Sequence, residues 1–188
     1  MATVTATRTH QVNGVDLDIL METVGAIQKD RDMGIARFRA SNTWMNGAQN
    51  RSAVTGFYGA RQEIPHTKPF AMEADEPPIL AGSDTAPNPV EHLLHALASC
   101  LTTSMVAHAA VRGLEIESLE AELEGDIDLN GFLGLDPNVP KGYTAIRVNY
   151  RIKANPDDID EIRSLASFSP VFNTLTQGAE VELSVEPV

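Results

Sequence analysis

The chain of 188 residues contains few cysteines and few basic residues, and each scarcity excludes some classes of protein. It contains one cysteine, Cys100, so it cannot form a disulfide within the chain, which favours a reducing compartment. We therefore expect a cytoplasmic protein. Lysine and arginine together number 14 against 26 aspartates and glutamates, a formal net charge of -12. Binding to nucleic acid or to an anionic membrane surface needs a surplus of positive charge, so we expect neither partner.

The first residues of the sequence do not resemble a secretory leader, and the most apolar stretch is interrupted by polar residues. Its first residues, MATVTATRTH, contain no long apolar stretch behind a basic start. The most apolar stretch, residues 93–111, is close to the length that spans a bilayer, but it contains two histidines and several serines and threonines. We therefore expect a buried core helix here and no membrane span.

Hydrophobic spacing in the first half predicts a helix followed by strands. Residues 15–29 place apolar side chains three and four apart, which predicts a first helix that ends near Gly34. Residues 35–44 and 51–58 are rich in aromatic and β-branched residues and flank a loop that contains Asn46-Gly47, which predicts a β-hairpin. Residues 70–74 are a further expected strand. The proline-rich residues 75–89 are expected to form a crossover loop that leads into the long helix.

The second half predicts two more strands and further helices. Residues 119–129 alternate apolar with acidic side chains, which predicts a strand with one buried face and one acidic, solvated face. A second alternating strand is expected at residues 146–152, a helix from Pro156, a short helix from about Pro170, and a last strand at residues 181–185. Such blocks of strands and helices indicate an α+β fold. We expect one domain, residues 1–188, with a helical extension at residues 1–34 and a core at residues 35–188.

Two separated motifs carry a resemblance to a known family. The first runs from Asn88-Pro89 to Ala98-Ser99-Cys100-Leu101-Thr102, and the second is SPVFNTLT at residues 169–176. Together with the order of the expected elements, these motifs resemble the OsmC/Ohr family of osmotically inducible and organic-hydroperoxide-resistance proteins. The resemblance implies antiparallel strands with a long central helix, a second helix pair, and an intertwined homodimer.

The resemblance further implies a thiol-dependent site that reduces small hydrophobic hydroperoxides. Cys100 takes the position of the attacking thiolate, and Arg51, just after the hairpin loop, is the nearest match to the arginine that stabilises the thiolate. Because strand register cannot be fixed from sequence, Arg37, Arg39 and Arg61 are alternatives for that arginine.

This chain departs from the family pattern at two positions. Ser169 stands where the family has a resolving cysteine, so a sulfenic acid at Cys100 would need an external thiol as reductant. A serine before proline at a helix start is also a common N-cap, which is the structural alternative for Ser169. The family's glutamate position falls on Val90, and the neighbouring Glu91 is the candidate replacement.

Spacing along the helix separates Glu91 from Cys100. On one straight helix the nine-residue interval places them about 13 Å apart along the axis and about 180° apart around it. Glu91 could therefore meet the thiol only from a partner chain or through a break in the helix, and its alternative role is that of an acid in the positive first turn. His92 and His95 do not converge with Cys100 on that helix, so we expect no metal and no other cofactor.

The sequence leaves three interpretations open. In the first, the protein is a hydroperoxide reductase that uses Cys100 and an external thiol. In the second, it binds an apolar or acyl ligand at the dimer interface without catalysis, and Cys100 only packs, as free cysteines often do. In the third, it is a structural relic with neither activity. A guanidinium close to the thiol favours the first interpretation, because it stabilises the reactive thiolate.

Overall fold

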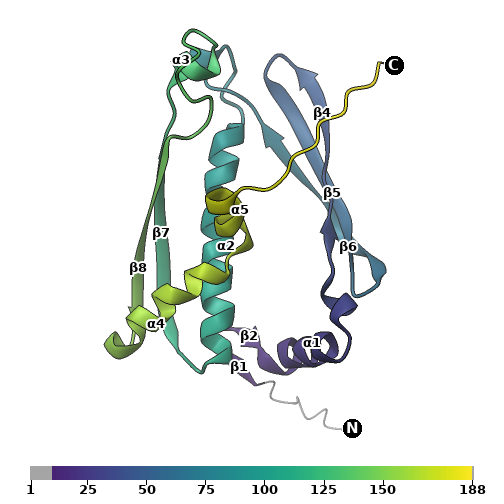
Figure 1. Cartoon of the computed structure of the whole chain (residues 1–188), viewed down its shortest axis with the longest axis vertical. Helices are drawn as coiled ribbons and strands as arrows, with labels where there is room; N and C mark the ends of the chain where they lie inside the picture. Colours follow the sequence, from purple (N-terminus) through teal and green to yellow (C-terminus); the bar gives the residue numbers. More distant parts are fainter. Residues whose placement is uncertain (1–9, 188) are drawn as a thin grey trace, which may run out of the picture. The chain divides into compact units, whose positions relative to one another are not determined.

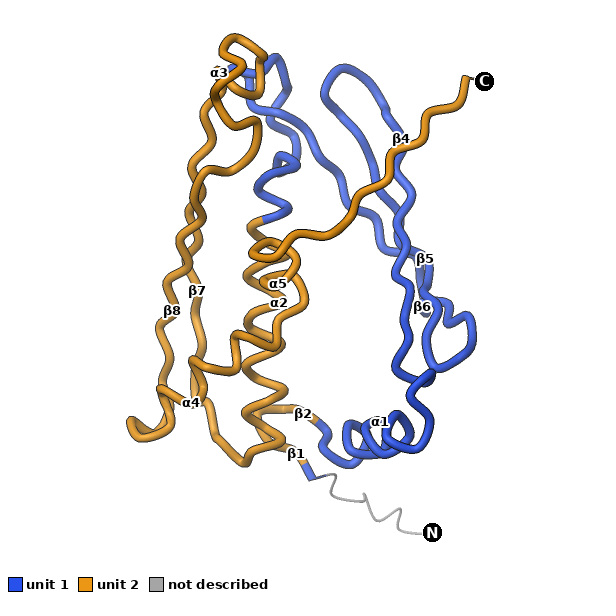
Figure 2. Tube along the Cα trace, in the orientation of Figure 1, with its two compact units in different colours: residues 1–10, 16–93 blue, residues 11–15, 94–188 orange. Residues whose placement is uncertain are grey.

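The computed structural model describes residues 10–187, which form α-helices and antiparallel strands (Figure 1). The described residues divide into two compact units (Figure 2). Unit 1 contains His10 and residues 16–93, and unit 2 contains residues 11–15 and 94–187. The architecture is α+β, as the sequence predicts. The single domain with a helical extension stays a prediction, and residues 1–9 of that extension lie outside the described part.

The predicted first helix begins two residues later than expected. Asn13 and Gly14 both adopt positive φ, 52° and 75°, and form the turn of a hairpin between β1 (Gln11–Val12) and β2 (Val15–Asp16). The Asp16 carboxylate then caps α1 (Leu17–Lys29) by accepting the backbone N–H groups of Asp18 and Ile19. A 3₁₀ helix, η1 (Arg31–Gly34), follows and ends at the predicted glycine.

In the sheet of unit 1, β5 (Gln49–Gly59) is the strand that pairs with all the others. This strand is antiparallel to β4 (Ser41–Asn46), to β6 (Gln62–Ala74) and to the short β3 (Arg37–Phe38). The hairpin between β4 and β5 is confirmed. The strand expected at residues 35–44 is instead two strands, because Phe38 pairs with Phe57 near the end of β5 while Thr43 pairs with Arg51 near its start. The strand expected at residues 70–74 is the end of the longer β6.

Unit 2 packs most of the long helix α2 (Pro89–Val111) against a two-stranded ribbon. β7 (Ile116–Asp126) and β8 (Ala145–Ala154) pair antiparallel over their whole lengths, which confirms both alternating strands. Their inner face covers one stripe of the helix, and the buried cluster consists of Leu97, Leu101, Met105, Ala109 and Leu165. Among residues 10–187, α2 is the one helix long and apolar enough to cross a membrane by length and composition alone. One stripe of this helix is buried within the chain, and that stripe amounts to 28% of its most apolar window.

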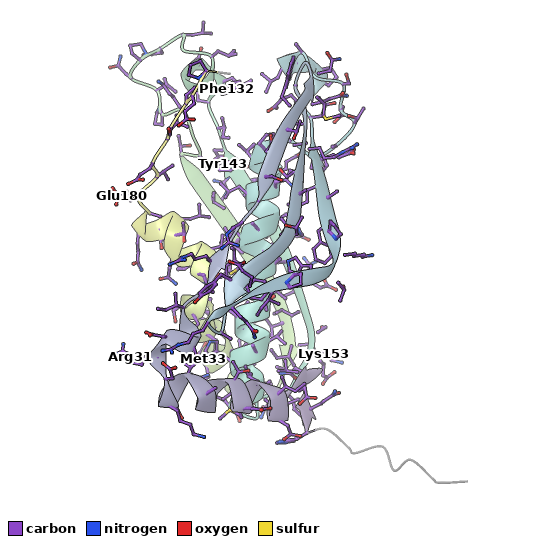
Figure 3. All side chains as sticks on the ribbon, turned by 90° about the vertical axis from the view of Figure 1, so that its right-hand side faces the viewer. Arg31, Met33, Phe132, Tyr143, Lys153 and Glu180 are labelled. Atoms are coloured by element: carbon purple, nitrogen blue, oxygen red, sulfur yellow. The ribbon has the colours of Figure 1, made fainter. Side chains whose placement is uncertain are left out.

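The outer face of the ribbon carries paired charges. Arg147 binds Glu124 and Asp126, Arg151 binds Glu120 and Glu122, and Lys153 binds Glu117. The acidic face expected from sequence is therefore exposed, as predicted, and three basic side chains of the neighbouring strand offset part of the charge of its five acids. Figure 3 labels Tyr143 and Lys153 toward opposite ends of this ribbon, and Gly125 of β7 leaves room for the ring of Tyr143.

The remaining helices follow the ribbon or interrupt it. β7 ends at Asp126 rather than at residue 129, because Asp128 caps a short helix, α3 (Leu129–Phe132), that the sequence does not predict. The predicted second helix pair is confirmed as η3 (Pro156–Asp158), α4 (Ile159–Ser164), η4 (Leu165–Phe168) and α5 (Pro170–Gln177). The prediction of a last strand at residues 181–185 is wrong. This segment has no regular structure, and its Val181, Leu183 and Val185 are exposed.

Candidate functional site

Cys100 lies on α2 beside the buried stripe of that helix rather than within it. The stripe repeats every four residues, at positions 97, 101, 105 and 109, whereas Cys100 is about 100° around the axis from Leu101. The thiol-bearing residue is partly buried and has a free sulfur. The structure places Cys100 outside the buried cluster of its own chain, and whether it reacts or only packs stays a prediction.

The turn of α2 around Cys100 is tied to β8 by Tyr150. The Tyr150 hydroxyl donates to the carbonyl oxygen of Ala98 at 3.1 Å and lies 3.0 Å from the hydroxyl of Thr102. Burial raises the pKa of Tyr150, the Thr102 hydrogen bond opposes this rise, and negative charge on Cys100 adds to it. Tyr150 is thus held as a neutral phenol that donates a hydrogen bond to the helix on the N-terminal side of the cysteine.

Ser169 is the N-cap of α5. Its side chain is fully buried, and its hydroxyl oxygen accepts the backbone N–H of Phe172 at 3.2 Å. The structural alternative predicted for Ser169 is confirmed. A buried cap has no exposed group to offer to an oxidised sulfur, so nothing at this position replaces the resolving cysteine.

Arg51 lies on β5 and is bound to Glu73 of β6. The two residues are direct partners in the strand register, and both Nε and Nη2 of Arg51 donate to Glu73 Oε1, at 3.1 and 2.6 Å. The three alternative arginines have partners elsewhere in unit 1. Arg39 binds Glu63, Arg61 binds Asp30 and Asp32, and Arg37 lies over the ring of Tyr58.

A small pocket adjoins the Arg51–Glu73 pair. Its volume is about 140 Å³, and its walls are formed by Met45, Gln49, Asn50, Arg51, Glu73, Ala74, Thr85 and Ala86. The ring of His92, on the first turns of α2, places Nε2 2.9 Å from the backbone oxygen of Glu73. The strand that carries Glu73 is therefore attached to the start of the helix that carries the cysteine.

Asp75, which sequence reasoning missed, fixes the loop at the edge of this pocket. It is 1% exposed, and its carboxylate accepts the N–H groups of Glu76, Ser83 and Thr85 and the hydroxyl of Thr85. Burial opposes ionisation of Asp75, but these hydrogen bonds together outweigh it and lower the pKa to about 2. The only sequence signal was the Asp75-Glu76 pair of acids at the start of a proline-rich loop.

Glu91 forms a capping box with Asn88 at the start of α2. The Asn88 side chain accepts the Glu91 N–H at 2.8 Å, and the Glu91 carboxylate accepts the Asn88 N–H at 2.8 Å. This arrangement gives Glu91 the role expected of an acid in a first helical turn. Its catalytic role stays a prediction.

The three residues predicted for the site fall in different parts of the chain. Arg51 and Glu91 belong to unit 1, and Cys100 belongs to unit 2. Within unit 1 the predicted Arg51 is paired with Glu73 rather than with Glu91. His92 contacts a backbone oxygen, and among residues 10–187 no three histidine, cysteine or acidic side chains form a cluster that could hold a metal ion.

Comparison with solved structures places the fold among OsmC-like proteins. An OsmC-like protein from Mycoplasma pneumoniae matches with a TM-score of 0.57 and 17% identity, over 74% of this chain and 87% of that one. A proposed osmotic stress induced and detoxification response protein from Psychrobacter arcticus matches with a TM-score of 0.54 and 15% identity, over 72% of this chain and 85% of that one. No curated protein sequence gave a match. Residues 82–184 match the family described as OsmC-like protein, and the chain therefore belongs to the OsmC-like family.

Proposed function

We propose that the protein reduces organic hydroperoxides through Cys100 and is regenerated by an external thiol. The observation that supports this most is the place of Cys100: it lies on the central helix of an OsmC-like fold, partly accessible and outside the buried cluster. A cysteine retained only for packing would be expected within that cluster, since free cysteines are among the most buried residues. A small hydrophobic hydroperoxide is the proposed substrate.

The proposed reaction has two stages. The Cys100 thiolate attacks the terminal oxygen of the hydroperoxide, so that an S–O bond forms, the O–O bond breaks, and the alkoxide takes a proton and leaves as an alcohol. Cys100 is then a sulfenic acid. One external thiol displaces water to form a mixed disulfide, and a second thiol releases reduced Cys100 and an external disulfide.

An external reductant is required by the environment of Ser169. In this chain the position of the family's second cysteine is a buried helix cap, and its hydroxyl is engaged with the N–H of Phe172. It offers no sulfur for an internal disulfide. A small dithiol or a partner protein with a reactive thiol is therefore part of the proposal.

Arg51 is the proposed cationic partner of the thiolate. A guanidinium remains protonated at any physiological pH, and its charge favours the ionised form of a thiol brought close to it. Arg51 lines a pocket, which supports its choice over the alternatives, because Arg37, Arg39 and Arg61 are not among the residues of that pocket. Glu91 stays a second candidate, with its carboxylate occupied by the capping box.

The proposal includes a homodimer. In the most apolar window of α2, 28% of the residues are buried within the chain, so much of an apolar helix remains to be covered. Large side chains on unit 1 are also open to solvent, with Phe38 at 79% and Trp44 at 72% exposure. A second copy would cover such surfaces. The mass of one chain is 20.3 kDa, and sedimentation at micromolar concentration should give twice this mass. A monomer would contradict the proposed homodimer.

The test of the reaction is thiol-dependent consumption of tert-butyl hydroperoxide with dithiothreitol as reductant. We expect Cys100→Ser to reduce the rate to the level without protein. Ser99→Ala, a change at an exposed neighbour on the same helix, is the matched control and should keep the wild-type rate. Equal rates for Cys100→Ser and wild type would overturn the proposal, and an apolar molecule retained in native mass spectrometry would then favour a binding protein.

A further inference from the structure

Neither residue that the sequence offers at or beside the family's glutamate position supplies an acid to Arg51 in this structure. Val90, at the position itself, has an apolar side chain. Glu91, the next residue, directs its carboxylate to the backbone N–H of Asn88 at 2.8 Å. If the guanidinium of Arg51 needs an acid to hold it, that acid must come from another element.

Glu73 meets this need from the neighbouring strand. It is the direct register partner of Arg51, so the two side chains leave the sheet on the same face. Two nitrogens of the guanidinium converge on one carboxylate oxygen, at 3.1 and 2.6 Å, which fixes the orientation of the guanidinium as well as its position. Both residues also line the pocket of about 140 Å³.

The backbone of Glu73 is itself positioned by the helix of the cysteine. His92 of α2 lies 2.9 Å from the Glu73 carbonyl oxygen, and the buried Asp75 anchors the chain two residues further on. The carboxylate of Glu73 is therefore carried by a backbone segment that is held at Glu73 itself and two residues further on. A long and flexible arginine side chain would otherwise sample many rotamers, at a cost in side-chain entropy each time it is placed.

The geometry points to Glu73 as the residue that positions Arg51, in place of the glutamate that OsmC-like relatives with a second cysteine would carry at the Val90 position. This inference rests on the proposed function, in which Arg51 acts on the Cys100 thiolate. Glu73 touches neither peroxide nor thiol in this proposal, so it is a positioning residue. Its effect on folding should be small, because Arg51 and Glu73 are 54% and 58% exposed and exposed ion pairs contribute little.

The test measures how fast iodoacetamide alkylates Cys100 as a function of pH, on the full chain. We expect Arg51→Ala to slow alkylation at neutral pH by roughly tenfold and to move its midpoint to higher pH, as loss of a neighbouring cation does. Glu73→Ala should reproduce most of this change. Glu73→Gln, which keeps the oxygen that accepts both hydrogen bonds, should show a smaller loss. The double variant should react no more slowly than Arg51→Ala alone, since both changes remove one function.

Glu63→Ala is the matched control. It breaks the Arg39–Glu63 pair, which is about as exposed as the Arg51–Glu73 pair, and Glu63 lies on β6 like Glu73. Alkylation should stay within about twofold of wild type. The inference is overturned if Glu73→Ala reacts like wild type while Arg51→Ala is slow. It is also overturned if Glu73→Ala reacts faster than wild type, because Glu73 would then only neutralise the charge of Arg51. If Arg51→Ala itself reacts like wild type, the role of Arg51 in the proposed function fails, and this inference fails with it.

Discussion

The hydroxyl of Tyr150 lies 3.0 Å from that of Thr102 and also donates to the Ala98 carbonyl at 3.1 Å. Tyr150 of β8 thereby contacts Ala98, two residues before Cys100, and Thr102, two residues after it. The neighbouring inner-face residue, Val148, packs against the buried cluster of the same helix. The orientation of the cysteine-bearing turn thus depends on both an apolar contact and a polar one.

Removal of the Tyr150 hydroxyl should loosen this turn. We expect Tyr150→Phe to lower the free energy of unfolding by about 1 kcal/mol, the usual net value of such a hydrogen bond. Urea denaturation at neutral pH measures the change. Tyr58→Phe, which keeps the ring under Arg37, serves as the control and should alter stability less. Equal stability of Tyr150→Phe and wild type would show that the two contacts add nothing to folding.

Two substitutions separate the capping role of Glu91 from a catalytic one. Glu91→Ala breaks the capping box and should lower the free energy of unfolding by about 1 kcal/mol. Glu91→Gln can preserve the box, because glutamine serves at this position as well as glutamate, and should be as stable as wild type. We expect Glu91→Gln to keep the rate of hydroperoxide consumption. A tenfold loss in this stable variant would establish the catalytic role that the resemblance implies.

Elements with a strong local pattern could be predicted from the sequence. The alternation around Leu119 and Val148 identified β7 and β8, because a ribbon packed on one side buries every second residue. The cap at Ser169 followed from its position before Pro170 at a helix start. The resemblance of the same two segments to OsmC/Ohr proteins correctly gave the family.

Features that depend on pairing between distant residues could not be predicted. The segment at residues 181–185 alternates like a strand, but no ladder forms in the described chain, and alternation alone supplies no hydrogen-bonding partner. Asp75 accepts hydrogen bonds from Thr85, ten positions later, and from Gln49, 26 positions earlier, and no local pattern encodes these contacts. The partner of Arg51 depended on the register between β5 and β6, which is set by the sheet as a whole.

Ser169 should affect stability without affecting chemistry. Ser169→Ala removes the acceptor of the Phe172 N–H and should lower the free energy of unfolding by about 1 kcal/mol, as the loss of an N-cap usually does. Thermal and urea unfolding measure this loss. Ser164→Ala is the control and should cost less, because the Ser164 hydroxyl, at the end of α4, donates to the Glu161 carbonyl and makes no capping hydrogen bond to a backbone N–H. We expect unchanged hydroperoxide consumption for Ser169→Ala, whereas a strong decrease with the fold intact would assign the hydroxyl a part in the reaction.

Asp75 should make stability depend on pH in a defined window. Its pKa in the folded chain, about 2, lies below the ordinary value of 3.8 because the hydrogen bonds to its carboxylate outweigh the effect of burial. A group with a lowered folded pKa stabilises the protein fully above its unfolded pKa, and this stabilisation is lost as the pH falls through the folded pKa. The stability difference between wild type and Asp75→Asn should therefore be constant above about pH 5 and should shrink between about pH 4 and pH 2. Urea denaturation at several pH values measures it, with Asp84→Asn, an exposed position of the same loop, as control. If the two stability curves of wild type and Asp75→Asn run parallel from pH 5 to pH 2, the hydrogen bonds to Asp75 do not favour its ionised form, and the loop beside Arg51 is held by other contacts.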